Sequence, residues 1–403
     1  MDLVKELVLA SEAGNETAVA ELLNNGANPD AMGPNSGALH CAAFNGHLSV
    51  VKMLLEKGAN PNVADHQSFY PLHLAASKKH LSIVKELIIA HGADLNVVTS
   101  SLGTVLHIAA AINFYEILTV GEIKKMSFEA RDHEKKTALN VAASFGNYSF
   151  GYHIINLGAD VNTIDQSGNS PLLNVLYQLE RTKIQSWSSE GSNSGVHVKY
   201  QITNGCFRYI KPYKGGVNEL GRVLSMVDQL EISGYSWGPE GLADYVNCVL
   251  LIQYLIKKGA EVNIKNHKGT TPMIFACSVG EAEVITALAK KGASFDDRTD
   301  EGITTLHYLA ISKRLDGLKA FYKYNENPQT DVVDNKGWTP AHYLADLGGH
   351  PDMAKLLIKN GVDLFRCSTK EFVALKKGIT AREVAEHWND HEMVKLLTPK
   401  KRK

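Results

Sequence analysis

The chain has 403 residues, and its 42 lysine and arginine residues balance 43 aspartate and glutamate residues. This balance argues against a general binder of nucleic acid or of anionic membranes, which would carry a basic excess. Hydrophobic residues make up 44% of the chain, as in globular proteins, and the longest strongly apolar run, Val246 to Ile256, is about half of a membrane span.

The five cysteines are odd in number and include no C-x-x-C pair, which is typical of reduced thiols in an intracellular protein. The amino-terminal residues lack the apolar stretch and cleavage site of a signal peptide. We therefore expect a soluble protein in the cytoplasm or the nucleus.

A short motif recurs along the chain and predicts a helix at each copy. It is complete at Thr339, where the threonine can cap a helix and Pro340 can occupy its first position. Glycines then end this helix and a second one. The motif starts at residues 37, 70, 104, 137, 170, 271, 304 and 339, so most steps are 33 to 35 residues. One such unit cannot bury its own apolar face and needs neighbours on both sides.

This pattern resembles the ankyrin repeat. The resemblance implies an all-α solenoid of about ten repeats, each with two helices and a β-hairpin finger. Residues 1–29 form the amino-terminal cap, and residues 379–398 form the carboxyl-terminal cap. Residues 1–183 are expected to hold repeats one to six, with the first helix of repeat six at the end. Residues 244–398 are expected to complete repeat six and to add repeats seven to nine and the cap.

Four repeats depart from the regular pattern, and one of them is repeat eight, where Tyr322 to Pro328 replaces the usual end of the second helix. Ala90-His91-Gly92 adds one residue before a finger in repeat three, and repeat four is irregular around Val120 to Ile123. The step of 101 residues between the motifs at 170 and 271 is longer than one repeat by about two repeat lengths. Two degenerate repeats would fit this length, but no motif is found inside it. We favour an insertion between the two helices of repeat six.

Residues 184–243 are therefore predicted to form an accessory module. Trp187 to Gly195 has the composition of a flexible loop. Asn204-Gly205 between alternating apolar residues predicts a β-hairpin, and Asn218 to Ile232 predicts a helix. Together they give a small hairpin-and-helix unit, which we expect to lie on one face of the solenoid.

Histidine recurs at one motif position in five repeats. Such a residue can hydrogen-bond to the motif threonine and to the turn of the next repeat, and we interpret it as structural rather than catalytic. This set comprises His40, His73, His107, His307 and His342. The chain contains no H-E-x-x-H, no zinc-spaced cysteine and histidine cluster, no P-loop and no G-x-S-x-G. We expect no catalytic residue, no cofactor and no metal.

The resemblance to ankyrin-repeat proteins implies that a partner protein binds at the finger tips and the first helices. Tyr70 and Trp338 are aromatic residues of the kind that dominate interfaces, and we expect Trp338→Ala to weaken binding without lowering the melting temperature. The residues predicted to contact a partner are Phe69, Tyr70, His133, Lys135, His267, Lys268, Asn335, Lys336 and Trp338.

The chain ends in a basic tail, residues 399–403. Lys400, Lys401, Arg402 and Lys403 follow Pro399 and resemble a nuclear localisation signal.

The predicted function is that of a non-catalytic scaffold or adaptor, which acts as a monomer and binds a partner protein, but no nucleic acid and no membrane. Two alternatives stay open. One is the substrate-recognition subunit of a ubiquitin ligase, and the other is a relative of the tankyrase-like ADP-ribosyltransferases without the catalytic domain.

Overall fold

The computed structural model describes residues 3–34, 36–99, 102–188, 241–348, 350–369 and 378–398. Within them the chain forms ten successive helix pairs, which confirms the predicted all-α solenoid. The first members of the pairs, here called the inner helices, are α1 (Leu3–Glu12), α3 (Ala38–Asn45), α5 (Pro71–Ser77), α7 (Val105–Ala111), α8 (Ala138–Phe145), α10 (Pro171–Ser188), α15 (Pro272–Val279), α17 (Thr305–Ser312), α19 (Pro340–Leu347) and α21 (Ala381–His387).

The second members of the pairs, here called the outer helices, are more varied. They are α2 (Glu16–Asn24), α4 (Leu48–Glu56), α6 (Leu81–Lys85) with η1 (Glu86–Ala90), η2 (Tyr115–Thr119) with η3 (Ile123–Lys125), α9 (Tyr148–Asn156), α14 (Gly241–Lys257), α16 (Ala282–Ala289), α18 (Leu315–Tyr324), α20 (Pro351–Lys359) and α22 (His391–Leu397).

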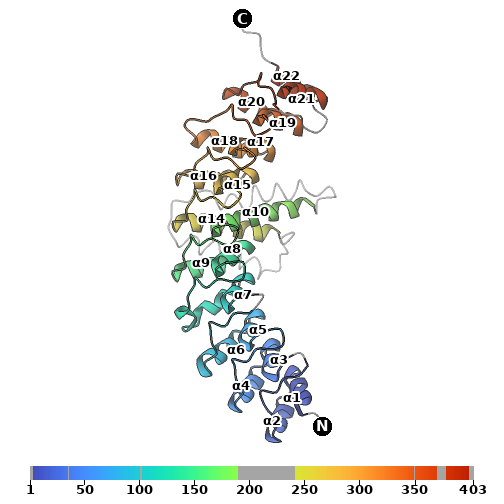
Figure 1. Cartoon of the computed structure of the whole chain (residues 1–403), viewed down its shortest axis with the longest axis vertical. Coiled ribbons are helices and arrows are strands. Elements are labelled where there is room, and N and C mark those ends of the chain that lie inside the picture. Colours follow the sequence, from blue (N-terminus) through green and yellow to red (C-terminus); the bar gives the residue numbers. More distant parts are fainter. Residues whose placement is uncertain are drawn as a thin grey trace, which may run out of the picture.

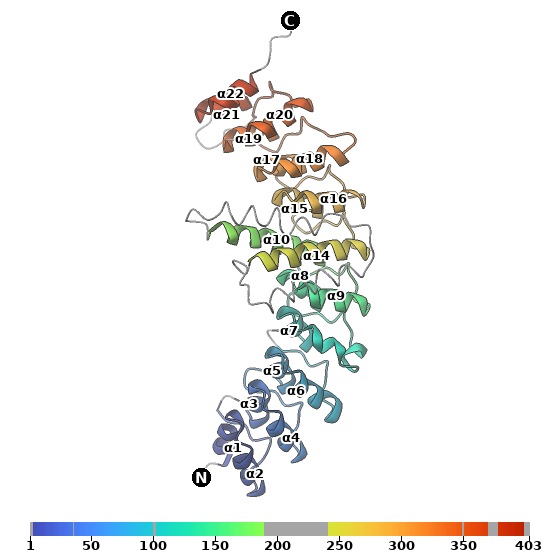
Figure 2. The same ribbon diagram turned by 180° about the vertical axis from the view of Figure 1, so that it is seen from behind.

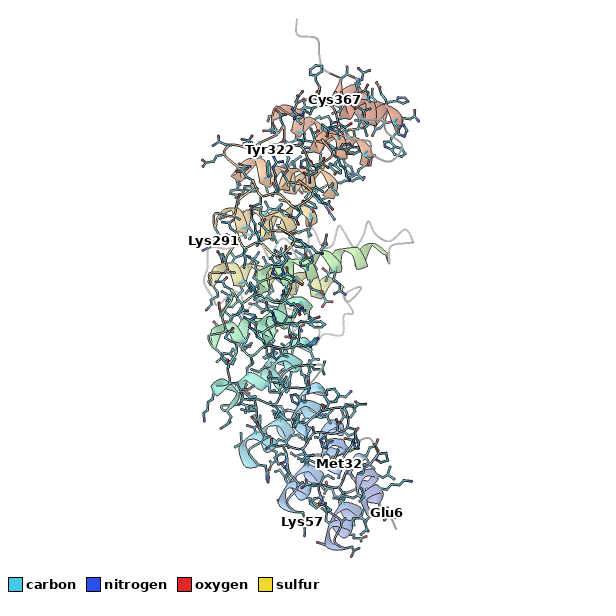
Figure 3. The ribbon with its side chains drawn as sticks, viewed as in Figure 1. Glu6, Met32, Lys57, Lys291, Tyr322 and Cys367 are labelled. Atoms are coloured by element: carbon cyan, nitrogen blue, oxygen red, sulfur yellow. The ribbon has the colours of Figure 1, made fainter. Side chains whose placement is uncertain are left out.

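The pairs stack into a crescent, with the inner helices on the inside of the curve and the outer helices on the outside (Figure 1). Side chains follow the same division in Figure 3, where Lys57 and Lys291, which come after outer helices, lie on the left and Glu6 of α1 lies on the right. The core runs between the two rows of helices through the whole stack, and paired alanines such as Ala42 and Ala43 are fully buried in it. Small residues let neighbouring inner helices pack closely, so each repeat covers the apolar face of the next.

The fingers are tight turns in the described residues and contain isolated bridges rather than strands. In the turn at 334–338, the N–H of Asp334 donates to the carbonyl of Trp338 at 3.0 Å, and the N–H of Gly337 donates to the carbonyl of Asp334 at 3.0 Å. The Asp334 carboxylate accepts from the N–H groups of Lys336 and Trp338, each at 2.8 Å. These local bonds satisfy the backbone without a longer ladder, which explains why the predicted β-hairpins are this short.

Successive finger turns are also bonded to each other. The N–H of Gln166 donates to the carbonyl of Glu134 at 2.9 Å, and the N–H of Asn335 donates to the carbonyl of Glu301 at 3.0 Å. In six of the finger turns the fourth residue has a left-handed backbone, as at Gly337 with φ +77°. This conformation brings the next finger so close that a side chain at Gly337 would collide with Thr369.

We expect Gly337→Ala to lower the free energy of unfolding by about 2–4 kcal/mol, since it combines backbone strain with overpacking. A Cβ at Gly337 would lie 2.5 Å from Thr369 Oγ1 and 2.6 Å from Thr369 N. Gly361 is the matched control, because it has φ +86° and a Cβ at this position would meet nothing within 4 Å beyond its chain neighbours. Its replacement by alanine should cost about 1 kcal/mol from the backbone alone. Equal urea-unfolding midpoints for the two variants would contradict the close approach of the fingers.

Two irregular repeats have a structural explanation. The extra residue before the third finger is accommodated where α6 continues into η1, a π-helical turn, which takes up one more residue than an α-helical turn. In repeat four the second helix is replaced by the short 3-10 helices η2 and η3, as the irregular sequence around Val120 indicates.

The two helices next to the predicted insertion are the longest in the described part of the chain, with 18 residues in α10 and 17 in α14. They pack against each other and complete one helix pair. Both views show α10 projecting from the inner side of the crescent beyond its neighbours (Figures 1 and 2). The predicted loop, hairpin and helix at 184–243 fall almost entirely outside the described residues, and their assignment stays a prediction.

Candidate functional site

Four of the five recurring histidines link an inner helix to the next finger, namely His40, His107, His307 and His342. In His107, His307 and His342, Nδ1 lies 3.1 to 3.2 Å from the N–H of the motif threonine, which can only donate, so Nδ1 accepts. Nε2–H then donates to a carbonyl of the next finger, for instance from His307 to Trp338 at 2.9 Å. Asn140 occupies the equivalent position in α8, where its side-chain oxygen accepts a hydrogen bond from the Thr137 hydroxyl at 2.8 Å. The predicted structural role of this position is confirmed.

Burial keeps these rings neutral. It lowers the pKa of His73 and His307 to about 4, and lowers the pKa of His40, His107 and His342 in the same direction, because a charged imidazole is poorly solvated there. Hydrogen bonds to carbonyls oppose the effect of burial but do not overcome it. A protonated Nδ1 would also face a backbone donor, so the network holds only the neutral ring.

The finger turns carry most of the residues predicted to contact a partner. His133, Lys135, His267, Lys268, Asn335 and Lys336 are all exposed on turns of the stacked row. Phe69 and Tyr70 are half-buried at the start of α5, where the Tyr70 ring lies 5.6 Å from the ring of His73.

Two of these residues also hold neighbouring turns together. The Asn335 side-chain amide donates to the Asp300 carbonyl at 2.9 Å, and the N–H of His267 donates to the Ser167 carbonyl at 3.1 Å. Both residues are exposed, but they already form hydrogen bonds that stabilise the stack of turns. His133, Lys135 and Lys268 are the exposed tip side chains that remain most suitable for a partner.

The prediction that Trp338 contacts a partner is wrong. Its side chain is 0% exposed, because the turn that ends at Gly337 directs it into the core. The indole packs at 5.2 Å from the ring of Tyr343 and at 5.7 Å from the ring of His342. It is a core residue of the finger, and a partner cannot reach it.

The sequence reasoning missed an aromatic surface on the inner helices. Four rings occupy one face of four helices that are neighbours in space, α10, α15, α17 and α19. We call this set the aromatic row, and it consists of Tyr177, Phe275, Tyr308 and Tyr343. Three of these residues stand four positions after the motif start, and Tyr177 lies one helical turn further on. That shared spacing was the available signal.

The three tyrosines of the aromatic row are half-exposed, whereas Phe275 is buried against Tyr177 with 3.9 Å between ring centroids. The Tyr343 hydroxyl donates to Asp334 Oδ2 at 2.7 Å, which fixes its ring beside Trp338. Half-exposed, well-packed aromatic rings lose little entropy on binding and are frequent in interfaces. The row is thus a rigid surface for contact.

Exposed apolar side chains also gather at the ends of inner helices. Phe145, in the last turn of α8, is 54% exposed, and Trp388, just after α21, is likewise 54% exposed. The Trp388 indole N–H donates to Asp346 Oδ1 at 2.9 Å, which holds the ring in place. Large rings held in contact with solvent are typical of protein-binding surfaces.

Other kinds of site find little support in the described ranges. They contain no group of three or more histidine, cysteine, aspartate or glutamate residues placed to hold a metal ion. No helix in the same ranges is long and apolar enough to cross a membrane. The Tyr245 hydroxyl donates to Glu281 at 2.6 Å, and the pKa of Glu283 is raised to about 7 by burial and then by the charge of Glu281. The predicted nuclear localisation residues Lys400, Lys401, Arg402 and Lys403 lie outside the described residues.

Comparison with known families gives matches on both sides of the insertion. A family described as ankyrin repeats in many copies matches residues 7–55, 39–88 and 306–358. A second, described as ankyrin repeats in three copies, matches residues 72–165 and 242–331. Together these ranges cover more than half of the chain and leave out the segment around the insertion.

Three similar proteins show how widely such repeats are used. The human transient receptor potential cation channel subfamily A member 1 is 25% identical over 79% of this chain and 30% of its own length. The E3 ubiquitin-protein ligase KEG of Arabidopsis thaliana is 22% identical over 93% of this chain and 20% of its own length. The human ankyrin repeat and SOCS box protein 16 is 27% identical over 42% of this chain and 39% of its own length. The chain thus spans less than half of each of these relatives.

Proposed function

Because the chain belongs to the ankyrin-repeat family, we propose that it is a non-catalytic adaptor that binds a partner protein through the inner face of its solenoid. The fold alone indicates that the chain binds other proteins, but it does not identify them. The observation that carries the proposal is the aromatic row on neighbouring inner helices, together with the exposed ring of Phe145 on α8, the helix that packs against α10. The three tyrosines of the row pack against the core and still expose part of each side chain, so they can contact a partner without rearrangement.

The adaptor proposal predicts that inner-face substitutions remove partners and outer-face ones do not. The full chain, used as bait in quantitative affinity capture, is compared with Phe145→Lys and Tyr308→Leu. Ile89→Lys is the matched control, because Ile89 is a 60% exposed apolar residue of the outer helix η1. We expect the captured amount of a defined set of proteins to fall about ten-fold with at least one inner-face variant. Binding at the inner face would be contradicted if Ile89→Lys lost the same proteins, or if no variant lost any of them.

A second candidate function is substrate recognition within a ubiquitin ligase. It is supported by the similarity to the E3 ubiquitin-protein ligase KEG and to the ankyrin repeat and SOCS box protein 16. In that case the same capture would recover ligase subunits whose amount is unchanged by Phe145→Lys, since they would bind outside the substrate surface. The tankyrase-like alternative, the monomeric state and the cytoplasmic or nuclear location stay predictions.

A further inference from the structure

The charges that act on the aromatic row are carboxylates. Burial raises the pKa of Tyr308, and the charges of Glu301 and Glu180 raise it further. Burial also raises the pKa of Tyr177 and of Tyr343. The charge of Glu180 adds to the increase at Tyr177, and the charge of Glu301 adds to the increase at Tyr343. Negative charge close to three of the four rings of the row gives this face a preference for a cation.

Two of these carboxylates have no basic partner within the part of the chain that the structure describes. Glu180 and Glu301 form no ion pair with a lysine or arginine among the residues that the structure describes. Glu180 is half-buried, and burial raises its pKa because the charged form loses hydration. Asp334, in contrast, is satisfied by Tyr343 and by backbone N–H groups. A cationic ligand would therefore meet two carboxylates that no described lysine or arginine already pairs with.

The stacking of the helices sets the spacing of such a ligand. Packed helices lie roughly 8–10 Å apart, and an extended peptide rises about 3.3 Å per residue. A peptide laid along the row would thus bring every third residue over the next inner helix. Arginine suits each position, because its planar cation stacks on aromatic rings and pairs with carboxylates.

We propose that the aromatic row, with Glu180 and Glu301 beside it, binds an extended protein segment that carries arginines three residues apart. The inference rests on the proposed adaptor function and adds the chemistry of the partner. Tyr177, Tyr308 and Tyr343 supply the ring faces, and Glu180 and Glu301 supply the charge. Segments of the same charge in another spacing fit this surface less well.

The test uses labelled peptides and the full chain in fluorescence anisotropy at near-physiological salt. The probes are four repeats of Arg-Gly-Ser, an isomer with its four arginines in one block, and four repeats of Glu-Gly-Ser. We expect the spaced arginine peptide to bind about three-fold or more tightly than the block isomer, and the acidic peptide not to bind. Equal binding of the two arginine peptides would show general charge attraction and overturn the spacing.

Variants locate the binding. Tyr308→Leu should weaken the spaced peptide about ten-fold, and Tyr308→Phe, which keeps the ring, should stay within about two-fold of the unmodified chain. Glu180→Gln should weaken it about three-fold without lowering the thermal midpoint, since it removes a half-buried charge. Asp316→Asn on the outer helix α18 is the charge-matched control and should have no effect, because Asp316 lies on the other side of the solenoid. Equal losses with Asp316→Asn, or none with Glu180→Gln and Tyr308→Leu, would overturn the proposal.

The failure of this inference differs from the failure of the adaptor function. If no arginine peptide binds while captured proteins still depend on Phe145 or Tyr308, the adaptor function holds and the partner's chemistry is wrong. If neither peptides nor captured proteins depend on the inner face, the adaptor function itself fails. A spaced peptide that binds only after deletion of residues 189–240 would show that this segment of the chain occupies the row, which also overturns the proposal for the intact protein.

Discussion

Trp338→Ala is expected to lower the free energy of unfolding by about 3–5 kcal/mol, the usual cost of removing a large aromatic ring from a core. The Trp338 side chain is fully buried and is the largest such side chain in the described residues. Its backbone is equally engaged, since its N–H donates to Asp334 Oδ1 at 2.8 Å and its carbonyl accepts from His307 Nε2 at 2.9 Å. The cavity would open where one finger, its own helix and the preceding inner helix meet.

Urea unfolding at neutral pH measures this effect, and the chain supplies a matched control. Trp388→Ala removes the same side chain from an exposed position, where the indole makes one hydrogen bond to Asp346. We expect it to cost less than about 1 kcal/mol. Equal losses in the two variants, or an unchanged midpoint for Trp338→Ala, would contradict the burial of Trp338.

Acidification from pH 7.5 to 4.5 is expected to destabilise the solenoid strongly through its buried histidines. The pKa of His73 and of His307 is about 4 in the folded chain, and about 6.5 is usual for histidine in an unfolded chain. The unfolded chain thus binds protons first. The stability contributed by each neutral ring is present above pH 6.5 and is lost as the pH falls toward 4. Each of the two contributes about 3 kcal/mol to this loss, and the other three shift in the same direction.

His307→Asn isolates the contribution of one ring. Asn140 already occupies the equivalent position in α8, where its amide donates to the carbonyls of Thr163 at 3.3 Å and Asn169 at 3.4 Å. An asparagine at 307 can therefore keep much of the network without a titrating group. We expect urea midpoints close to those of the unmodified chain at pH 7.5 and higher than those of the unmodified chain at pH 4.5. An identical decline in both proteins would show that His307 does not titrate as described.

The sequence predicted the repeats well because the helix signals are local. A threonine cap, a proline at the first helical position and a closing glycine act within a few residues, so the period and most helix starts follow from them. The extra residue near His91 and the irregular stretch around Val120 also indicated where the helices are disturbed. The shared histidine position predicted a hydrogen bond to the next finger in four of five repeats, because the finger lies at a similar distance from the ring in each of them.

The binding surface was harder to predict, because exposure depends on tertiary contacts. Trp338 stands at a position that the motif leaves free, and such positions are often exposed. Only the left-handed turn at Gly337 and the close approach of the next finger show that the indole points inward. Tyr308 and Tyr343 lie within the motif, where packing residues are expected, although part of each ring faces the inner surface.

The central claim is that the inner face of the solenoid meets the partner, and photo-crosslinking tests it most directly. A benzophenone amino acid replaces Tyr308 on the inner helix α17 in one protein and Lys355 on the outer helix α20 in another. Irradiation in cells that express the full chain is expected to give discrete protein adducts from position 308 and none of these from position 355. Adducts that form equally from both positions, or only from position 355, would contradict binding at the inner face.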